Sequence, residues 1–358
     1  MYSPTTQAPV FYSEDGVDKL NLHIKKTNYS KVFILVDSNT INYCLTPFLQ
    51  SLKSECEIEV IEMEAGEENK NIETCTQIWL TLSELGADRK SILINLGGGV
   101  LTDLGGFIAS TFKRGIDFIN VPTTLLSMVD ASIGGKTGID LDNLKNQVGV
   151  ISQPEMVIIE TKFLDTLPAN EMRSGLAEIF KHGLISDKKY WEKATGLQNL
   201  TLDDLDELIK GSVEIKSKIV KQDPTEKHLR KTLNFGHTFG HAIESYYLSA
   251  PGKEPLLHGE AIAIGMIMAG YISSKTVGLS EAECEKITKN LLEFFPKTYI
   301  SSADFDQIKD LLKFDKKNSH GNINFVLLNE IGVAQVDCTV PAELWEEAKD
   351  YYNSASIE

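Results

Sequence analysis

The first 160 residues alternate short apolar runs with helical patterns, and this alternation constrains the fold more than any other feature of the chain. The runs at 31–37 (KVFILVD) and 91–99 (SILINLGGG) end in turn-forming residues, as parallel strands covered on both faces do. Between them, residues 71–85 place apolar side chains at helical spacing. Further strands are predicted at 117–122 and 156–160. This rhythm predicts an α/β domain with a mostly parallel sheet.

After residue 168 the pattern changes to one helix after another. Helices are predicted at roughly 170–185, 203–222, 237–248, 258–277, 280–295, 303–313 and 341–354. A single hairpin, near 322–328 and 333–338, interrupts them. We therefore expect two domains, an α/β domain at 1–160 and a mainly α-helical domain at 161–358.

Composition limits the classes of partner. The 358 residues carry a formal charge of −16, which argues against a nucleic-acid partner but still permits a locally basic pocket for an anionic small molecule. Five scattered cysteines fit a reducing compartment. The first residues lack the pattern of a signal peptide, and the apolar run at 261–272 is too short to cross a membrane. We expect a cytoplasmic protein without a membrane partner, and a buried helix at that run.

A glycine-rich turn joins a predicted strand to a predicted helix in LGGGVLTDLGGF (96–107). Three glycines let the backbone approach a ligand closely, and the N-terminus of the helix favours a pyrophosphate. A strict G-x-G-x-x-G motif would need glycine at position 102, where this chain has Thr102. A tight turn without a ligand is the alternative. Asp103 is either a helix cap or a ligand contact.

A second chemistry-bearing stretch spans 121–149 and contains Asp130, Lys136, Lys145 and Asn146. Lysines are most often solvated surface charges. Lys136 is the exception we favour, because it directly follows a pair of glycines that would clear space for a ligand beside its ammonium group. Such an arrangement commonly holds phosphate.

Glu178, Lys181 and His182 occupy positions i, i+3 and i+4 of the helix predicted at 170–185 and so share one face. One interpretation is a surface salt bridge worth roughly 0.2–0.5 kcal/mol. The apolar neighbours of Glu178 favour a partly buried carboxylate, which needs a partner or a metal.

Two histidines lie four residues apart in NFGHTFGHAIES (234–245), which places His237 and His241 on one helix face. They either bind one metal together or have different roles. Together with Glu178, His237 and the more distant His258 would supply one carboxylate and two imidazoles, a set suited to catalytic zinc with one open position. The 59 and 21 residues between them leave their convergence to the tertiary structure.

Six motifs occur in the order found in the 3-dehydroquinate synthases, a family of sugar phosphate cyclases, between about residues 64 and 328. They are GGGVLTDLGGF, RGIDFINVPTTLLSMVDASIGGKT, KNQVG, SGLAEIFKHG, LRKTLNFGHTFGHAIE and LHGEAIAIGM. The resemblance implies a Rossmann-like N-terminal domain and a helical C-terminal domain. It also implies conversion of 3-deoxy-D-arabino-heptulosonate 7-phosphate to 3-dehydroquinate in the shikimate pathway, which leads to chorismate and the aromatic amino acids. Catalytic NAD, a zinc or cobalt ion and a homodimer are implied as well.

The same resemblance implies roles for individual residues. The metal ligands would be Glu178, His237 and His258. NAD contacts would fall on Gly66, Glu67, Lys70, Gly98, Gly99, Asp103, Thr123, Thr124, Lys145, Phe163 and Thr166. The anionic substrate would contact Arg114, Asp130, Lys136, Asn146, Lys181, Lys216, Arg230, Asn234 and His241, with Lys316 favoured over Lys317 as a further contact. His241 is also a candidate acid–base group.

Three alternatives stay open. A metal-dependent alcohol, glycerol or glycerol-phosphate dehydrogenase would usually carry aspartate where this chain has Glu178. A cyclase with a different product, such as a valiolone or inosose synthase, would not need Arg230 and Asn234 for a substrate carboxylate. The third is a catalytically silent scaffold that binds NAD or metal; metal content and activity would distinguish it.

Overall fold

The computed structural model describes residues 7–142, 144–197, 201–312, 318–319 and 322–357. The chain divides into two compact units, Met1–Pro168 and Ala169–Glu358. Among the described residues, no helix is long and apolar enough to cross a membrane.

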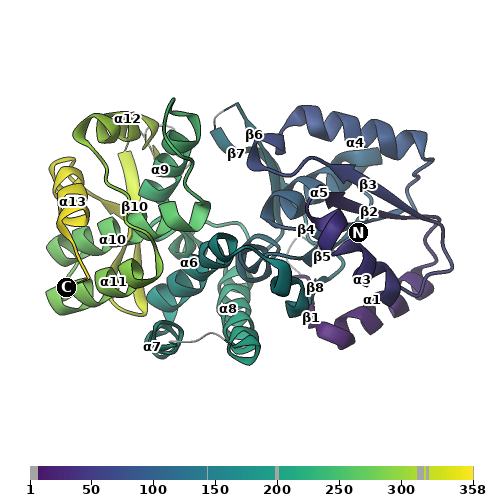
Figure 1. Ribbon diagram of the computed structural model, residues 1–358, viewed down its shortest axis with the longest axis horizontal. Helices are drawn as coiled ribbons and strands as arrows, with labels where there is room; N and C mark the ends of the chain where they lie inside the picture. Colours follow the sequence, from purple (N-terminus) through teal and green to yellow (C-terminus); the bar gives the residue numbers. More distant parts are fainter. Residues whose placement is uncertain (1–6, 143, 198–200, 313–317, 320–321, 358) are drawn as a thin grey trace. The chain divides into compact units, whose positions relative to one another are not determined.

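The first unit contains a six-stranded parallel sheet in the order β1-β8-β5-β4-β2-β3 (Figure 1). Its strands are β1 (Val10–Tyr12), β2 (Val32–Asp37), β3 (Ile58–Met63), β4 (Ile92–Gly97), β5 (Asp117–Pro122) and β8 (Val157–Ile159). The strands predicted near 31–37, 91–99, 117–122 and 156–160 are confirmed, and the sheet has the parallel order that the alternating pattern implied.

Helices cover both faces of this sheet (Figure 1). On one side lie α4 (Ile72–Glu84) and α5 (Gly99–Thr111), and on the other lie α1 (Ser13–Thr27) and α3 (Leu45–Ser51). Short elements complete the unit: α2 (Thr40–Tyr43), η1 (Glu67–Asn69), η2 (Phe112–Arg114), η3 (Ser127–Ala131) and η4 (Thr161–Thr166). Side chains of β2 and β4, including Phe33, Leu35 and Leu93, pack with those of α4 and α5 in one buried cluster. Burial on both faces explains why these strands are continuous apolar runs.

An antiparallel hairpin interrupts the α/β order between β5 and β8. It consists of β6 (Lys136–Leu141) and β7 (Leu144–Ile151), which the sequence did not indicate. Gly134 and Gly135, at φ +104° and +69°, lead into it. These positive φ angles explain the glycine pair before Lys136, because residues with a Cβ rarely adopt them.

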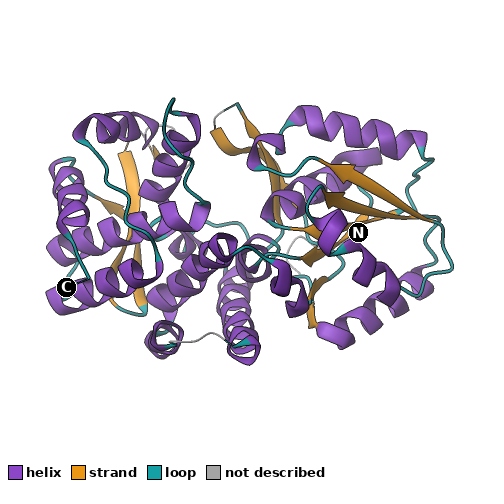
Figure 2. Ribbon diagram, in the orientation of Figure 1, coloured by secondary structure: helices purple, strands orange, loops and turns teal. Residues whose placement is uncertain are grey.

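The second unit is mainly helical (Figure 2). It contains α6 (Ala169–Ser186), α7 (Lys188–Gly196), α8 (Leu202–Gln222), η5 (Leu229–Asn234), α9 (His237–Ser249), α10 (His258–Thr276), α11 (Glu281–Phe294), α12 (Ser302–Leu312) and α13 (Glu343–Ser354). The strands β9 (Asn318–Ser319), β10 (Asn322–Glu330) and β11 (Val333–Thr339) form a small sheet. The predicted helices and the predicted hairpin are confirmed, and α7 is an additional helix. The run at 261–272 lies within α10 and is almost completely buried, as expected.

Candidate functional site

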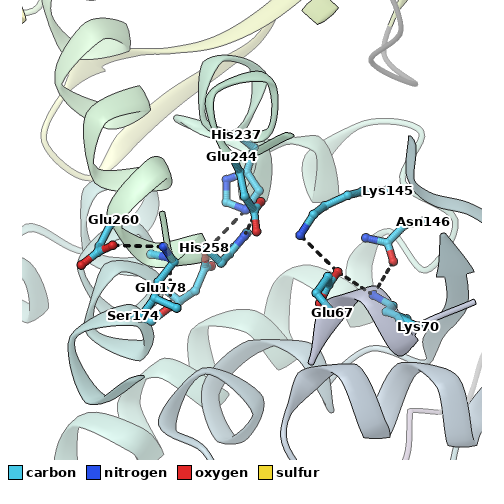
Figure 3. Close-up of polar contacts among 12 residues, drawn as sticks. Glu67, Lys70, Lys145, Asn146, Ser174, Glu178, His237, Glu244, His258 and Glu260 are labelled. Carbon is cyan, nitrogen blue, oxygen red and sulfur yellow. Dashed lines mark hydrogen bonds and ion pairs between the residues drawn. The ribbon is translucent and has the colours of Figure 1, made fainter. Parts of the chain in front are cut away.

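Three side chains from three helices converge in the second unit (Figure 3). Glu178 lies in the middle of α6, whereas His237 and His258 are the first residues of α9 and α10. Oε1 of Glu178 is 3.4 Å from Nε2 of His237 and 3.5 Å from Nε2 of His258. One potential ligand atom from each residue lies within 4.8 Å of the others. The structure thus brings together the three residues that sequence reasoning proposed as metal ligands.

Close helix packing produces this convergence. The amide of Gly259 in α10 donates a 2.9 Å hydrogen bond to the hydroxyl of Ser174 in α6. A Cβ at Gly265 in α10 would lie 2.0 Å from the carbonyl oxygen of Gly236, which caps α9. The backbones of the three helices can approach this closely only because these positions lack side chains.

The carboxylate of Glu178 is completely buried, and each of its two oxygens has its own neighbours. Its Oε2 accepts a hydrogen bond from Nζ of Lys181, which is 1 % exposed, and its Oε1 faces the two histidines. His182, on the same face of α6, contacts the hydroxyl of Ser212 through Nδ1 at 2.5 Å. This burial excludes the surface salt bridge as an interpretation of the Glu178–Lys181 pair.

The two histidines are oriented by contacts at their Nδ1 atoms. Nδ1 of His237 lies 3.1 Å from the carbonyl oxygen of Phe235, and Nδ1 of His258 lies 3.2 Å from Oε2 of Glu244. Burial lowers the pKa of His258, but the carboxylates of Glu244 and Glu178 outweigh it and raise this pKa to about 10. Two carboxylates thus interact with the His258 ring, and their negative charge favours a cation beside it.

His241 lies beside this group, one helical turn after His237. Its ring centroid is 5.0 Å from that of His237 and 5.9 Å from that of His258. His241, Glu244 and His258 form a second group of potential ligand atoms within 4.8 Å of one another. The two histidines of NFGHTFGHAIES thus belong to different groups that share His258.

A tight loop before α9 positions two further residues predicted to contact the substrate. The carboxylate of Asp223 accepts hydrogen bonds from the amides of Lys227, His228 and Arg230 at 2.7–3.0 Å. Burial raises the pKa of Asp223, but these donors outweigh it and lower the pKa. Arg230 is 2 % exposed and donates through Nη1 to the carbonyl oxygen of Pro224 at 2.9 Å.

Asn234, at the end of η5, donates through Nδ2 to Oε1 of Glu226 at 2.6 Å. Lys216 is buried in α8. Lys316 lies outside the described residues.

In the first unit, predicted NAD contacts gather at the carboxyl ends of the strands, where ligands bind in open α/β sheets. Gly98 caps α5 directly after β4, and Gly99 begins that helix. Thr123 and Thr124 follow β5, and the amide of Thr123 donates to the carbonyl of Gly97 at 3.0 Å. Five further members follow β3 and β8. They are Gly66 at φ +118°, Glu67 and Lys70 after β3, and Phe163 and Thr166 of η4 after β8.

Lys70 connects several of these residues (Figure 3). Its Nζ lies 2.8 Å from Oδ2 of Asp103 and 2.7 Å from Oδ1 of Asn146, although the side chain is only 4 % exposed. Burial lowers the pKa of Lys70, but Asp103, Glu67 and Asp140 outweigh it and raise the pKa. Nζ of Lys145 donates a 3.1 Å hydrogen bond to Oε1 of Glu67, so Lys145 belongs to the same ion-pair network. Asp103 is thus an ion-pair partner within α5 and not its cap.

Asp140 belongs to the same group, although the sequence did not single it out. It accepts a hydrogen bond from the amide of Asn146 at 2.7 Å. Burial raises the pKa of Asp140, the charge of Lys70 lowers it, and the charge of Glu67 raises it further. The net effect is a pKa of about 6.

The other predicted substrate contacts of this unit lie in different elements. Asp130 belongs to η3, and Lys136 is an exposed residue at the start of β6. Arg114 ends η2, after the C-terminal end of α5, and lines an open surface depression together with Asp88, Arg89 and Lys113. The helix α5 begins at the carboxyl end of β4 and Arg114 follows its C-terminal end. Arg114 therefore lies near the amino ends of the strands, whereas Gly98 lies at their carboxyl ends. Within this unit, the structure does not bring Arg114 to the predicted NAD contacts.

Sequence reasoning assigned no role to Asp223, Glu226 or Glu244. The clearest signal was present for Glu244, which stands seven residues after His237 and three after His241 and therefore on the same helix face.

A parallel α/β unit and a helical unit with a carboxylate–histidine centre define a class of enzymes with dehydroquinate synthase-like architecture. Residues 60–174 match the family model described as 3-dehydroquinate synthase N-terminal, and residues 175–318 match that described as 3-dehydroquinate synthase C-terminal. The 3-dehydroquinate synthase of Parabacteroides distasonis is 40% identical over 352 residues, 98% of this chain and 99% of the relative. The chain belongs to the 3-dehydroquinate synthase family, whose members act in the shikimate pathway.

Two solved structures extend the comparison. A 2-deoxy-scyllo-inosose synthase complexed with carbaglucose-6-phosphate, NAD⁺ and Co²⁺ has a TM-score of 0.83 at 25% identity and covers 98% of this chain and 100% of its own. The 2-epi-5-epi-valiolone synthase of Streptomyces hygroscopicus, with NAD⁺ and Zn²⁺ bound, has a TM-score of 0.85 at 25% identity and covers 98% of each chain.

Proposed function

We propose that the chain converts 3-deoxy-D-arabino-heptulosonate 7-phosphate to 3-dehydroquinate and phosphate, as a phosphate-eliminating carbon–oxygen lyase. The observation that carries this proposal is the convergence of Glu178 Oε1 with Nε2 of His237 and of His258. The 40% identity to a 3-dehydroquinate synthase, against 25% to cyclases with other products, supports this product.

The residues present fit a divalent metal. One carboxylate and two imidazole nitrogens are the donor set of catalytic zinc and cobalt centres, and Glu178 is completely buried, so its charge favours a cation. When bound, the metal supplies Lewis-acid polarisation of substrate oxygens, and NAD supplies a hydride acceptor that returns the hydride in the same turnover.

The substrate contacts follow from charge and hydrogen-bonding capacity. Arg230 and Asn234, held by the Asp223 loop and by Glu226, would bind the substrate carboxylate. Lys136 would bind the phosphate, and His241 would donate a hydrogen bond and exchange a proton with the reacting end. The remaining substrate contacts of the proposal are Arg114, Asp130, Asn146, Lys181, Lys216 and Lys316.

The nucleotide is assigned to the carboxyl edge of the parallel sheet in the first unit, and metal and substrate binding mainly to the second. The N-terminus of α5 at Gly98 and Gly99 offers free amides to a pyrophosphate. Lys70 and Lys145 place two cations among Glu67, Asp103 and Asp140, which orders the polar residues at this edge.

The test is incubation of the metal-loaded protein with the heptulosonate phosphate and NAD far below the substrate concentration, while phosphate release is followed. Phosphate should exceed NAD many times, because the hydride returns to the same molecule. NADH accumulating in proportion to product would contradict the proposal and favour a dehydrogenase. No turnover in the presence of bound metal and NAD would favour a scaffold.

We also propose a cytoplasmic homodimer that binds neither nucleic acid nor membrane. The five free cysteines fit a reducing compartment, and the charge of −16 argues against a nucleic-acid partner. The dimer is proposed from the family resemblance alone. Light scattering of the eluting protein should give twice the chain mass of 39.7 kDa, and a monomer mass would contradict it.

A further inference from the structure

We propose that Glu244 is a positioning residue that orients the imidazole of His258 for metal binding. This inference rests on the proposed metal centre of Glu178, His237 and His258. It adds a residue that does not itself bind the metal.

The geometry gives the two nitrogens of His258 different partners. Nδ1 lies 3.2 Å from Oε2 of Glu244, while Nε2 lies 3.5 Å from Oε1 of Glu178 (Figure 3). An ionised carboxylate can only accept a hydrogen bond, so Nδ1 carries the proton that is donated to Glu244. In the neutral imidazole, the lone pair is then on Nε2, the atom that faces Glu178.

His237 is held in the same manner by a different acceptor. Its Nδ1 contacts the carbonyl oxygen of Phe235 at 3.1 Å, and its Nε2 faces the same oxygen of Glu178. Both histidines therefore present Nε2 to one point and bind a protein oxygen through Nδ1. Carboxylates and carbonyls placed in this way around ligating histidines fix the tautomer and the ring orientation.

The local helix explains why Glu244 reaches His258. Glu244 stands on the face of α9 that also carries His237 and His241, and it is 5 % exposed. Burying a carboxylate is unfavourable without partners, so its contact with the His258 ring restricts both groups. A charged acceptor also increases the basicity of the imidazole beyond what a neutral carbonyl gives.

The competing assignment makes Glu244 a ligand, because Glu244, His241 and His258 also form a group of potential ligand atoms. In that assignment Glu244 lies beside Nδ1 of His258, whereas Glu178 lies beside Nε2 of both His237 and His258. If Glu244 is a ligand, its removal should abolish stoichiometric metal binding. If it is a positioning residue, one ion per chain should remain.

The experiment compares wild type, Glu244→Ala, Glu244→Gln and His258→Ala as full-length protein. Each is stripped with a chelator and titrated with Co²⁺ against a chromophoric competitor. Glu244→Ala should still bind one Co²⁺ per chain, but with an affinity about 10–100-fold lower and an altered visible Co²⁺ spectrum. Glu244→Gln should lose less affinity, because its amide oxygen can still accept from Nδ1. His258→Ala should lose the stoichiometric ion.

A matched control separates orientation from general loss of stability. Asp187 caps α7 by accepting the amide of Tyr190 at 3.0 Å. Asp187→Ala should lower the melting temperature while leaving the Co²⁺ affinity unchanged.

Three results would overturn the inference. Co²⁺ affinity of Glu244→Ala within about threefold of wild type would reduce Glu244 to a packing residue. Loss of the ion in Glu244→Ala, as in His258→Ala, would make it a ligand. If wild type bound no stoichiometric Co²⁺, the proposed metal centre itself would fail, and the inference with it.

Discussion

Gly259 of α10 lies against Ser174 of α6 so closely that a Cβ at this glycine would be 2.3 Å from the Ser174 carbonyl oxygen and 2.4 Å from its Cα. This contact joins the helix that carries Glu178 to the first turn of the helix that carries His258. The backbone approach between the two residues therefore fixes the spacing of two proposed metal ligands.

Gly259→Ala should separate these helices, because the obstructing atoms are backbone and cannot rotate away. We expect a loss of about 1–3 kcal/mol in the free energy of unfolding, from denaturant titration, and weaker Co²⁺ binding. Gly270→Ala in the same helix is the control: its Cβ would meet only a side-chain atom of Ile287 at 4.0 Å. It should be neutral or stabilise the protein by up to about 1 kcal/mol. Similar behaviour of the two variants would contradict the packing account.

Asp223→Ala should release the loop that positions Arg230, since one carboxylate accepts three backbone amides there. We expect kcat/KM for the heptulosonate phosphate to fall at least about tenfold. This corresponds to roughly 1.4 kcal/mol of lost transition-state stabilisation. Co²⁺ affinity should not change. Asp223→Asn, which keeps one acceptor oxygen, should be intermediate. A full loss of metal in Asp223→Ala would show that this loop supports the metal centre instead.

Asp304 should make stability depend on pH. Burial raises its pKa, but hydrogen bonds from Lys253, Tyr246 and Ser301 outweigh it and lower the pKa. A lowered pKa in the folded state means that the charged form stabilises the fold above the unfolded pKa of about 3.9. Asp304→Asn should therefore cost about 1–3 kcal/mol at pH 7. The difference from wild type should stay constant down to about pH 5 and shrink below about pH 4. Denaturant titrations at these pH values give the difference; one that does not change with pH would contradict this role.

Lys70→Met should weaken NAD binding. The substitution keeps much of the buried volume but leaves Asp103, Glu67 and Asp140 without the central cation. We expect the NAD dissociation constant to rise about tenfold or more, because removing one partner of a buried ion pair is costly. Calorimetric titration with NAD measures it. Lys90→Met, on the turn before β4, is the surface control and should leave NAD affinity unchanged. Unaltered NAD affinity in Lys70→Met would place the nucleotide elsewhere.

Most of the sheet could be predicted because its central strands are apolar on both faces. The strands that were not predicted lack that signal. In the parallel sheet, the residues of β1 are only partly buried, and β3 carries Glu59 and Glu62 at the edge of the sheet. In the separate hairpin, β7 is largely exposed. Exposure on one or both faces removes the continuous apolar run by which the other strands were recognised.

Residue chemistry suggested the trio of Glu178, His237 and His258, but not its convergence. That depends on backbone contacts such as those of Gly259 and Gly265, which connect helices distant in sequence. Glu244 could have been found from its position on the face of His237. The partners of Asp223 could not, because they are backbone amides that any residue types would supply.

The most direct test of the central claim is the metal content of Glu178→Gln. Glutamine keeps the shape of this fully buried side chain but removes the charge that faces both histidines. Wild type should hold one Zn²⁺ or Co²⁺ per chain by elemental analysis. Glu178→Gln should hold less than about a tenth of that, because losing the charge of a ligand should cost at least the roughly 10–100-fold in affinity that is lost when a partner of a ligand is changed. It should release no phosphate while still binding NAD. A Glu178→Gln protein that retained one ion per chain would contradict the account.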